Sequence, residues 1–189
     1  MSATLNPFRL PRDRILPSDQ LLIRREWAMP NRNTFRIPCI AKLLDEALAG
    51  MWVDPFCGKS SPAQITNDAN EEIPAQHHLD ALDFLTSIAA ESIDGVLFDP
   101  PYSVEQALRK YKPKQGGTAG RLEYQYACLR ELARIVKPNG KAICFGWDSN
   151  GVGKKRGFHL EEILLIAHGA AHRDTIVTIE RKQGAGASA

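Results

Sequence analysis

Several features that define common protein classes are missing from this 189-residue sequence. Its cysteines are widely spaced and form no C-x-x-C pair, which argues against a zinc site or a disulfide framework and for free thiols at Cys39, Cys57, Cys128 and Cys144. No apolar run approaches the roughly 18–20 residues that a membrane span needs, and the N-terminal residues lack the core of a signal peptide. We therefore expect a cytoplasmic protein with no bound metal.

The sequence also has little excess of either charge, because its formal net charge is only +2. Any contact with nucleic acid must then come from local basic patches rather than from a global positive field. The hydrophobic fraction of 43% and the charged fraction of 24% are ordinary for a globular protein. We expect a single domain over residues 21–182, an extended arm over residues 1–20 and a flexible tail over residues 183–189.

Short apolar runs alternate with segments of helical periodicity along the chain. The pattern predicts helices over residues 39–48, 82–90, 123–136 and 158–167. It predicts strands over residues 51–53, 63–66, 95–98, 142–145 and 175–180. Such alternation is typical of an α/β fold built around a mostly parallel sheet.

Acidic residues follow three of the predicted strands. Asp54 follows the first strand, Asp68 the second and Asp99 the strand over residues 95–98. The carboxyl ends of parallel strands meet at one edge of the sheet, and ligands of α/β proteins bind at that edge. The sequence therefore predicts a ligand site lined by these three carboxylates.

The run Asp99-Pro100-Pro101-Tyr102 is the most informative stretch of the sequence. Each proline holds the preceding residue extended and donates no N–H, so the Asp99 carboxylate and the Pro100 carbonyl can face one point. Two acceptors aimed at one point suit an amino group, and they draw the nitrogen of an aromatic amine toward the tetrahedral geometry of a nucleophile. Tyr102 adds a flat face on which a base can stack. The structural alternative is a rigid turn in which Tyr102 only packs, and the acidic residue before the prolines makes the functional interpretation the stronger one.

With these motifs the sequence resembles the S-adenosylmethionine-dependent DNA methyltransferases that modify amino groups, most closely the small adenine-specific enzymes of phages and prophages. The resemblance covers most of the chain and rests on residues 33–38, 52–58, 66–68, 79–85 and 99–102. It implies a Rossmann-like class I methyltransferase fold with a mostly parallel central sheet and a late antiparallel edge strand. It also implies methyl transfer to the N6 amino group of adenine in DNA, with a catalytic motif formed by Asp99, Pro100, Pro101 and Tyr102.

The same resemblance implies how S-adenosylmethionine is bound. Asp54 and Gly58 would meet its methionine end, Asp68 its ribose hydroxyls and Asp80 its adenine amino group, with Asp83 as the second choice for the last role. The full set implied for the cofactor is Phe35, Ile37, Pro38, Asp54, Pro55, Phe56, Gly58, Asp68, Asp80 and Asp99. Three of these residues have structural alternatives, because Asp54 can cap the next segment, Asp68 can form an Asx turn and Asp80 can cap a helix.

Two loops carry basic and aromatic residues that are candidates for nucleic-acid contact. One spans residues 103–121 and the other residues 146–157, and we expect both at the active edge of the sheet. The candidates are Tyr102, Arg109, Lys110, Lys112, Lys114, Arg121, Trp147, Lys154, Lys155 and Arg156. No segment is long enough for a separate target-recognition domain. DNA is the expected partner, RNA is less favoured, and both a monomer and a homodimer remain open.

One departure from a usual nucleotide-binding unit concerns residues 59–62, which leave room for little more than a turn before the second strand. Either the first crossover helix is reduced or that strand is misplaced, which weakens the assignment of Asp68. His168 and His172 have no further metal ligands nearby, so we expect a turn there rather than a metal site.

Other functions stay open on the sequence alone. Methylation of cytosine N4 in DNA, or of a base in RNA, would use the same chemistry, although an aspartate at the first motif position favours adenine. A non-catalytic nucleic-acid-binding module that kept the fold is disfavoured by the intact set of Asp54, Asp99, Pro100 and Tyr102. A nicotinamide-dependent oxidoreductase is disfavoured because its G-x-G-x-x-G turn is missing.

Overall fold

The computed structural model describes residues 20–101, 118–169 and 172–184, and the side chains of residues 118–121 lie outside this description. Its helices are α1 (Pro38–Ala47), α2 (Ala81–Ser87) and α4 (Thr118–Ile135), with short 3-10 helices η1 (Thr34–Arg36) and η2 (Lys154–Arg156). Its strands are β1 (Leu22–Trp27), β2 (Trp52–Asp54), β3 (Ile65–Thr66), β4 (Ile93–Phe98), β5 (Val136–Gly146), β6 (Phe158–Ala167) and β7 (Thr175–Lys182). Within these ranges no helix is long and apolar enough to cross a membrane.

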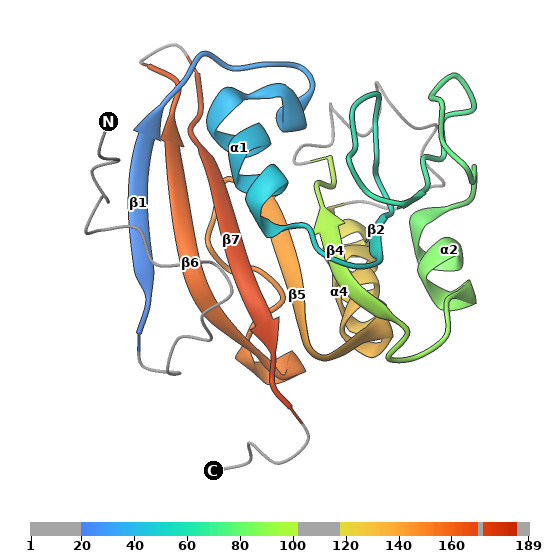
Figure 1. The fold of residues 1–189 in the computed structure, drawn as a ribbon. Coiled ribbons are helices and arrows are strands. Elements are labelled where there is room, and N and C mark those ends of the chain that lie inside the picture. Colours follow the sequence, from blue (N-terminus) through green and yellow to red (C-terminus); the bar gives the residue numbers. More distant parts are fainter. Residues whose placement is uncertain (1–19, 102–117, 170–171, 185–189) are drawn as a thin grey trace, which may run out of the picture.

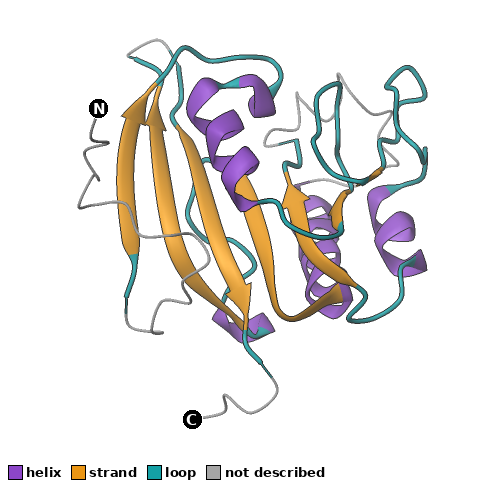
Figure 2. Ribbon diagram, in the orientation of Figure 1, coloured by secondary structure: helices purple, strands orange, loops and turns teal. Residues whose placement is uncertain are grey.

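The described strands form one sheet in the order β1-β6-β7-β5-β4-β2-β3 (Figures 1 and 2). All paired strands run parallel except β7, which is antiparallel to both β5 and β6. The predicted α/β fold with a mostly parallel sheet and a late antiparallel strand is confirmed. That antiparallel strand lies between β5 and β6, and the strands at the two edges are β1 and β3.

Each face of the sheet is covered by its own hydrophobic core. Helix α1 lies on one face, because its apolar residues recur at helical spacing and pack on β5, β6 and β7 through Ile40, Leu43, Leu44 and Ala47. Helices α2 and α4 lie on the other face, where they cover β4 and β5 (Figure 1). Strand β4 is buried between these layers, which explains its nearly continuous apolar sequence.

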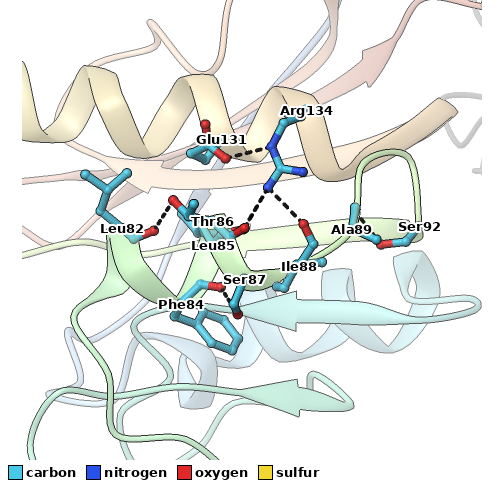
Figure 3. A network of polar contacts seen from close by, with 10 residues as sticks. All are labelled: Leu82, Phe84, Leu85, Thr86, Ser87, Ile88, Ala89, Ser92, Glu131 and Arg134. Carbon is cyan, nitrogen blue, oxygen red and sulfur yellow. Dashed lines mark hydrogen bonds and ion pairs between the residues drawn. The ribbon is translucent and has the colours of Figure 1, made fainter.

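Arg134 joins the two helices of the second face (Figure 3). Its guanidinium donates hydrogen bonds to the carbonyls of Leu85 at 3.1 Å and Ile88 at 2.8 Å, where α2 ends. It also pairs with Glu131, one turn earlier on α4, at 2.7 Å. A helix leaves its last carbonyls without partners, so Arg134 fixes the end of α2 from the neighbouring helix.

Two segments differ from the sequence-based expectation. The helix predicted over residues 158–167 is wrong, because this segment forms strand β6. Its glutamates and leucines favour a helix intrinsically, but β1 and β7 pair with it on both sides, and tertiary pairing overrides propensity. Arginines also neutralise its two buried glutamates, since Arg181 donates to Glu161 at 2.5 Å and Arg24 donates to Glu162 at 2.7 Å. Strand β1, which precedes the first predicted element, was not anticipated.

The remaining predicted elements are present with shifted ends. The helix predicted over 82–90 is shorter and ends at Ser87, and the strand predicted over 142–145 begins earlier, at Val136. Residues 55–64 between β2 and β3 contain no helix, and β3 pairs parallel to β2 with Asp54 opposite Thr66. The second strand was therefore placed correctly, and the first crossover is reduced to turns.

Candidate active site

Three carboxylates gather at the carboxyl edge of the sheet. Asp54 ends β2, which pairs with β3 on one side and β4 on the other. Asp68 lies two residues beyond β3, and Asp99 follows β4 directly. The predicted convergence of these three residues is therefore present, because parallel pairing brings the ends of all three strands to the same edge.

Asp54 is fully buried at the centre of this group. One carboxylate oxygen accepts the Phe56 N–H at 2.9 Å, and the other accepts the Ser61 hydroxyl at 2.6 Å. Burial is the main cause that raises the pKa of Asp54 to about 7, and the nearby charges of Asp99 and Asp68 add to the rise. The site therefore holds a carboxyl group that gains or loses its proton near neutral pH, and a cationic ligand would favour its ionised form.

Asp68 holds the turn that follows β2. Its Oδ2 accepts the Gly58 N–H at 3.1 Å, and its Oδ1 accepts the Asn70 N–H at 3.0 Å. The second bond is the Asx turn considered as the structural alternative. Gly58 has φ of +52°, a backbone conformation that favours glycine, and the position of a β-carbon there meets nothing within 4 Å. Asp68 thus positions an open stretch of backbone at the edge of the sheet.

Asn67 is a supporting residue that sequence reasoning missed. Its fully buried side-chain amide donates to the carbonyls of Pro55 at 3.1 Å and Leu79 at 3.0 Å, and its Oδ1 accepts the Leu79 N–H at 2.9 Å. These bonds tie the turn after β2 to the segment that leads into α2. The only sequence signal was an asparagine next to Asp68 after a short strand, a pattern that also marks ordinary turns.

Asp80 begins helix α2 and is exposed to solvent. Its Oδ1 accepts the Leu82 N–H at 2.9 Å, which is the N-cap considered as its structural alternative, and it also accepts the Tyr124 hydroxyl at 2.9 Å. Asp83 is likewise exposed, in the first turn of α2. Of the two, Asp80 is the one held in place by a bond from α4.

The predicted apolar wall of the cofactor site divides into buried and exposed parts. Phe35 and Ile37 belong to the core under α1, where the Phe35 ring lies edge-on to Phe145 with centroids 5.2 Å apart. Pro38 is the exposed first residue of α1. Phe56 is half-buried and stacks edge-on against Phe98, the last residue of β4, at 5.6 Å.

The catalytic motif is described as far as its second proline. Asp99 is half-buried, Pro100 is buried and Pro101 is half-buried. The influence of Asp99 on the pKa of Asp54 shows that the two carboxyl groups share one electrostatic environment. Tyr102, Arg109, Lys110, Lys112 and Lys114 lie outside the described residues, as does the side chain of Arg121.

Trp147 lies one residue beyond β5, the strand next to β4, and is 37% exposed. The guanidinium of Arg173 lies over its ring, 4.1 Å from the ring centroid. Arg173 was not a sequence candidate, because only the antiparallel pairing of β7 with β5 brings its segment beside Trp147. A flat ring backed by a cation forms a surface on which a base can stack.

The loop's basic candidates lie where the parallel strands begin, at the end of the sheet opposite the candidate site; they are Lys154, Lys155 and Arg156. This position corrects the expectation that the whole 146–157 loop borders the carboxyl ends of the strands. Along β7, Gly146 at the end of β5 pairs with Ile176, whereas Phe158 at the start of β6 pairs with Lys182. The loop therefore crosses the sheet from one edge to the other (Figure 1). The basic residues of this loop form η2, which lies away from Asp54 and Asp99.

His168 has structural partners for both ring nitrogens. Nδ1 lies 2.7 Å from the Ala28 carbonyl oxygen, and Nε2 lies 2.8 Å from the Thr175 hydroxyl. The His172 N–H donates to the Gly169 carbonyl at 3.1 Å, ahead of β7. Among the described residues, no group of three His, Cys, Asp or Glu side chains is arranged to hold a metal ion.

Several solved structures share this arrangement of strands and helices. TrmN from Thermus thermophilus superposes with a TM-score of 0.54 and 18% identity over 77% of this chain and 49% of TrmN. A 1,6-didemethyltoxoflavin-N1-methyltransferase from Burkholderia thailandensis, solved with 1,6-didemethyltoxoflavin and S-adenosylhomocysteine, superposes with a TM-score of 0.52 and 12% identity over 77% of each chain. The chain has a class I methyltransferase fold. It spans about half the length of TrmN, and no protein-family model or curated protein matches it.

Within this class I methyltransferase fold most of the predicted site residues that the structure describes fall into three groups. One group lies together at the carboxyl edge: Asp54, Pro55, Phe56, Gly58, Asp68, Asp99 and Pro100. A second group serves the core or a helix start, namely Phe35, Ile37, Pro38 and Asp80. The third group, Lys154, Lys155 and Arg156, is separated from the site by the length of the sheet.

Proposed function

We propose that the protein transfers a methyl group from S-adenosylmethionine to the exocyclic N6 amino group of adenine in DNA. The observation that carries this proposal is the position of the Asp99-Pro100-Pro101 segment. It follows the buried strand β4 and lies beside the buried carboxyl of Asp54, at the ligand-binding edge of a class I methyltransferase fold. The enzyme would be of the small phage and prophage type that its motifs resemble, and it would act in the cytoplasm.

The chemistry of the carboxyl edge suits this cofactor. Burial and two neighbouring carboxylates raise the pKa of Asp54 to about 7, so a ligand that brings positive charge is stabilised beside its ionised form. S-adenosylmethionine carries an ammonium and a sulfonium group, and it supplies an electrophilic methyl carbon when bound. Asp54 and the open Gly58 backbone would hold its methionine end, Asp68 its ribose and Asp80 its adenine.

The residues after β4 act on the amino group of the substrate. The Asp99 carboxylate and the Pro100 carbonyl accept hydrogen bonds from the two N–H groups of this amine. These bonds turn the nitrogen lone pair toward the methyl carbon. A methyl group supplied by the bound cofactor would leave the substrate nitrogen positively charged, and Asp99 or water would take the proton that this nitrogen then loses. No strong base is needed before the transfer, because the methylated nitrogen is acidic until that proton leaves.

The stack of Trp147 and Arg173 supports a base as the substrate. It follows β5, immediately beside the strand that carries Asp99, and it offers a partly exposed aromatic face next to a cation. A base taken out of a duplex loses stacking energy on the order of a few kcal/mol, and an aromatic face restores part of it. Tyr102 is proposed to provide a second face within the catalytic motif.

The test is incubation of the protein with labelled S-adenosylmethionine and separate DNA and RNA pools, followed by nucleoside analysis. We expect label on N6-methyladenine from DNA. Asp99→Ala should abolish transfer while leaving cofactor affinity largely intact, and Asp68→Ala should mainly weaken cofactor affinity. Asp45→Ala, at an exposed acidic position on α1, is the matched control. Label on cytosine or RNA would replace the proposed substrate. Absence of cofactor binding in a calorimetric titration would point to a non-catalytic binding module.

A further inference from the structure

Strand β1 forms one edge of the sheet, and among the described residues it pairs with β6 alone (Figure 1). An edge strand presents a row of backbone N–H and C=O groups that can pair with another chain. Soluble proteins commonly protect such edges with charged side chains or prolines. The question is therefore what the side chains of β1 present to solvent.

Large apolar side chains are exposed along β1 and its two ends. Leu21 is 45% exposed, Ile23 66%, Trp27 66% and Met29 63%. Ile23 and Trp27 lie on one face of the strand, because side chains alternate with a period of two, and Leu21 and Met29 flank the two ends of the strand. Ile163, which pairs with Ile23 across the sheet, is half-buried on this same face. The result is an apolar surface at the sheet edge that no described segment covers.

The backbone groups that point away from β6 belong to the same residues. The Ala28 N–H donates to the Ala167 carbonyl on β6 at 3.2 Å, so even-numbered residues direct their backbone groups inward. Because these groups alternate along an extended strand, Ile23, Arg25 and Trp27 direct theirs outward. A further strand added at this edge would bond to those three residues.

The sequence of this strand is arranged symmetrically about Arg25. Ile23 and Trp27 lie two residues on either side of it, and Leu21 and Met29 lie four residues on either side. We propose that β1 pairs with β1 of a second copy of this chain, antiparallel and with the two-fold axis at Arg25. Each exposed apolar residue then lies opposite an apolar residue, since Ile23 faces Trp27 and Leu21 faces Met29.

Charge complementarity favours this register. The Arg24 and Glu26 side chains are already 3.5 Å apart within one chain. In the dimer, Arg24 of each copy lies opposite Glu26 of the other copy. A two-fold axis at Arg24 would instead place Arg24 opposite itself and Ile23 opposite Arg25. An axis at Glu26 would place two glutamates opposite each other and Trp27 opposite Arg25. Cross-strand pairs of opposite charge stabilise a sheet, and like charges destabilise it.

The proposed register leaves one unfavourable pair, the two copies of Arg25 on the axis. Arg25 is exposed, so solvent and salt weaken this repulsion. Replacement of Arg25 by threonine removes the like charges and adds a residue that is favourable in strands. The register therefore predicts that Arg25→Thr strengthens the dimer, whereas loss of an arginine from an unrelated surface would leave association unchanged.

The first test is the mass of the full-length protein in solution, measured by light scattering during gel filtration at several concentrations. We expect a dimer that dissociates on dilution. The double variant Ile23→Lys/Trp27→Lys should be monomeric, and the control Met51→Lys, at an exposed apolar residue away from β1, should stay dimeric. A wild-type protein that is monomeric at every concentration would overturn the proposal. Another segment or partner would then cover the apolar edge.

A cross-link tests the register. In a hydrogen-bonded antiparallel pair the facing Cα atoms are about 5.5 Å apart, within the range of a disulfide. Arg25→Cys should therefore form a disulfide-linked dimer under copper–phenanthroline oxidation. Ile23→Cys is the matched control, because its two copies would lie about 13 Å apart along the strands. Equal cross-linking of both variants, or of neither, would refute this register, and wild-type protein gives the background from Cys39, the one half-exposed native thiol in the described residues.

Discussion

Replacing Asp54 with asparagine is expected to stabilise the free protein above neutral pH. Burial and two neighbouring carboxylates raise the pKa of Asp54 from an ordinary value of 3.8 to about 7. At about 1.4 kcal/mol per pH unit, this rise makes ionisation of Asp54 in the folded state cost about 4 kcal/mol. Under the proposed function, the positive charge of the bound cofactor would offset this cost.

The sign and pH range of the effect follow from the same pKa. Below about pH 4 the carboxyl is protonated in both folded and unfolded states, so it adds no penalty. The penalty grows as pH rises toward 7 and is constant above it. Asparagine cannot ionise, and its side-chain oxygen can still accept the Phe56 N–H. The difference in free energy of unfolding between Asp54→Asn and wild type should therefore grow by about 3 kcal/mol in favour of the variant as pH rises from 5 to 8.

Urea denaturation of both proteins at pH 5 and pH 8, followed by circular dichroism, measures this difference. Asp94→Asn is the control of opposite sign, because the hydrogen bond and charge of Lys137 lower the pKa of Asp94. That variant should be less stable than wild type by the same amount at pH 5 and at pH 8, because both values lie above the range in which Asp94 gains its proton. The reasoning fails if Asp54→Asn is less stable than wild type at pH 8, or if its advantage is the same at both pH values.

Three further predictions follow from the site and its supports. Wild-type affinity for S-adenosylmethionine should fall about tenfold per pH unit below pH 7, and the affinity of Asp54→Asn should be lower and independent of pH, as measured by calorimetric titration. Trp147→Ala should weaken DNA binding by about 1–3 kcal/mol in an anisotropy titration; a change as small as that of Lys155→Ala, at the opposite sheet edge, would contradict the stacking role. Arg134→Met should destabilise the fold by about 1–3 kcal/mol in urea, since it leaves carbonyls at the end of α2 without their charged donor; a loss below about 0.5 kcal/mol would show that water replaces it.

Local sequence patterns were sufficient for the centre of the fold. Strands β2 and β4 were placed correctly because each is a short apolar run that ends in or before an aspartate, and β3 because turn residues follow a β-branched pair. Once these strands are parallel, their ends must share one edge, and the convergence of Asp54, Asp68 and Asp99 follows without further information.

Non-local pairing decided the features that the sequence did not reveal. Segment 158–167 has helix-forming residues, and it is a strand because β1 and β7 pair with it and arginines from both strands neutralise its glutamates. The stack of Arg173 on Trp147 joins residues that only the direction of β7 brings together. The path of the loop after β5 likewise depends on β6 starting at the far edge, which separates Lys154 from the site.

The central claim is that Asp99 presents an amino group of DNA to an electrophilic methyl carbon. The most direct measurement compares wild-type protein with Asp99→Ala at saturating S-adenosylmethionine and counts methyl groups on adenine N6 in the DNA product. The account predicts methylated adenine with the wild-type protein and none with the variant, although the variant still binds the cofactor. Equal methylation by the two proteins would contradict it.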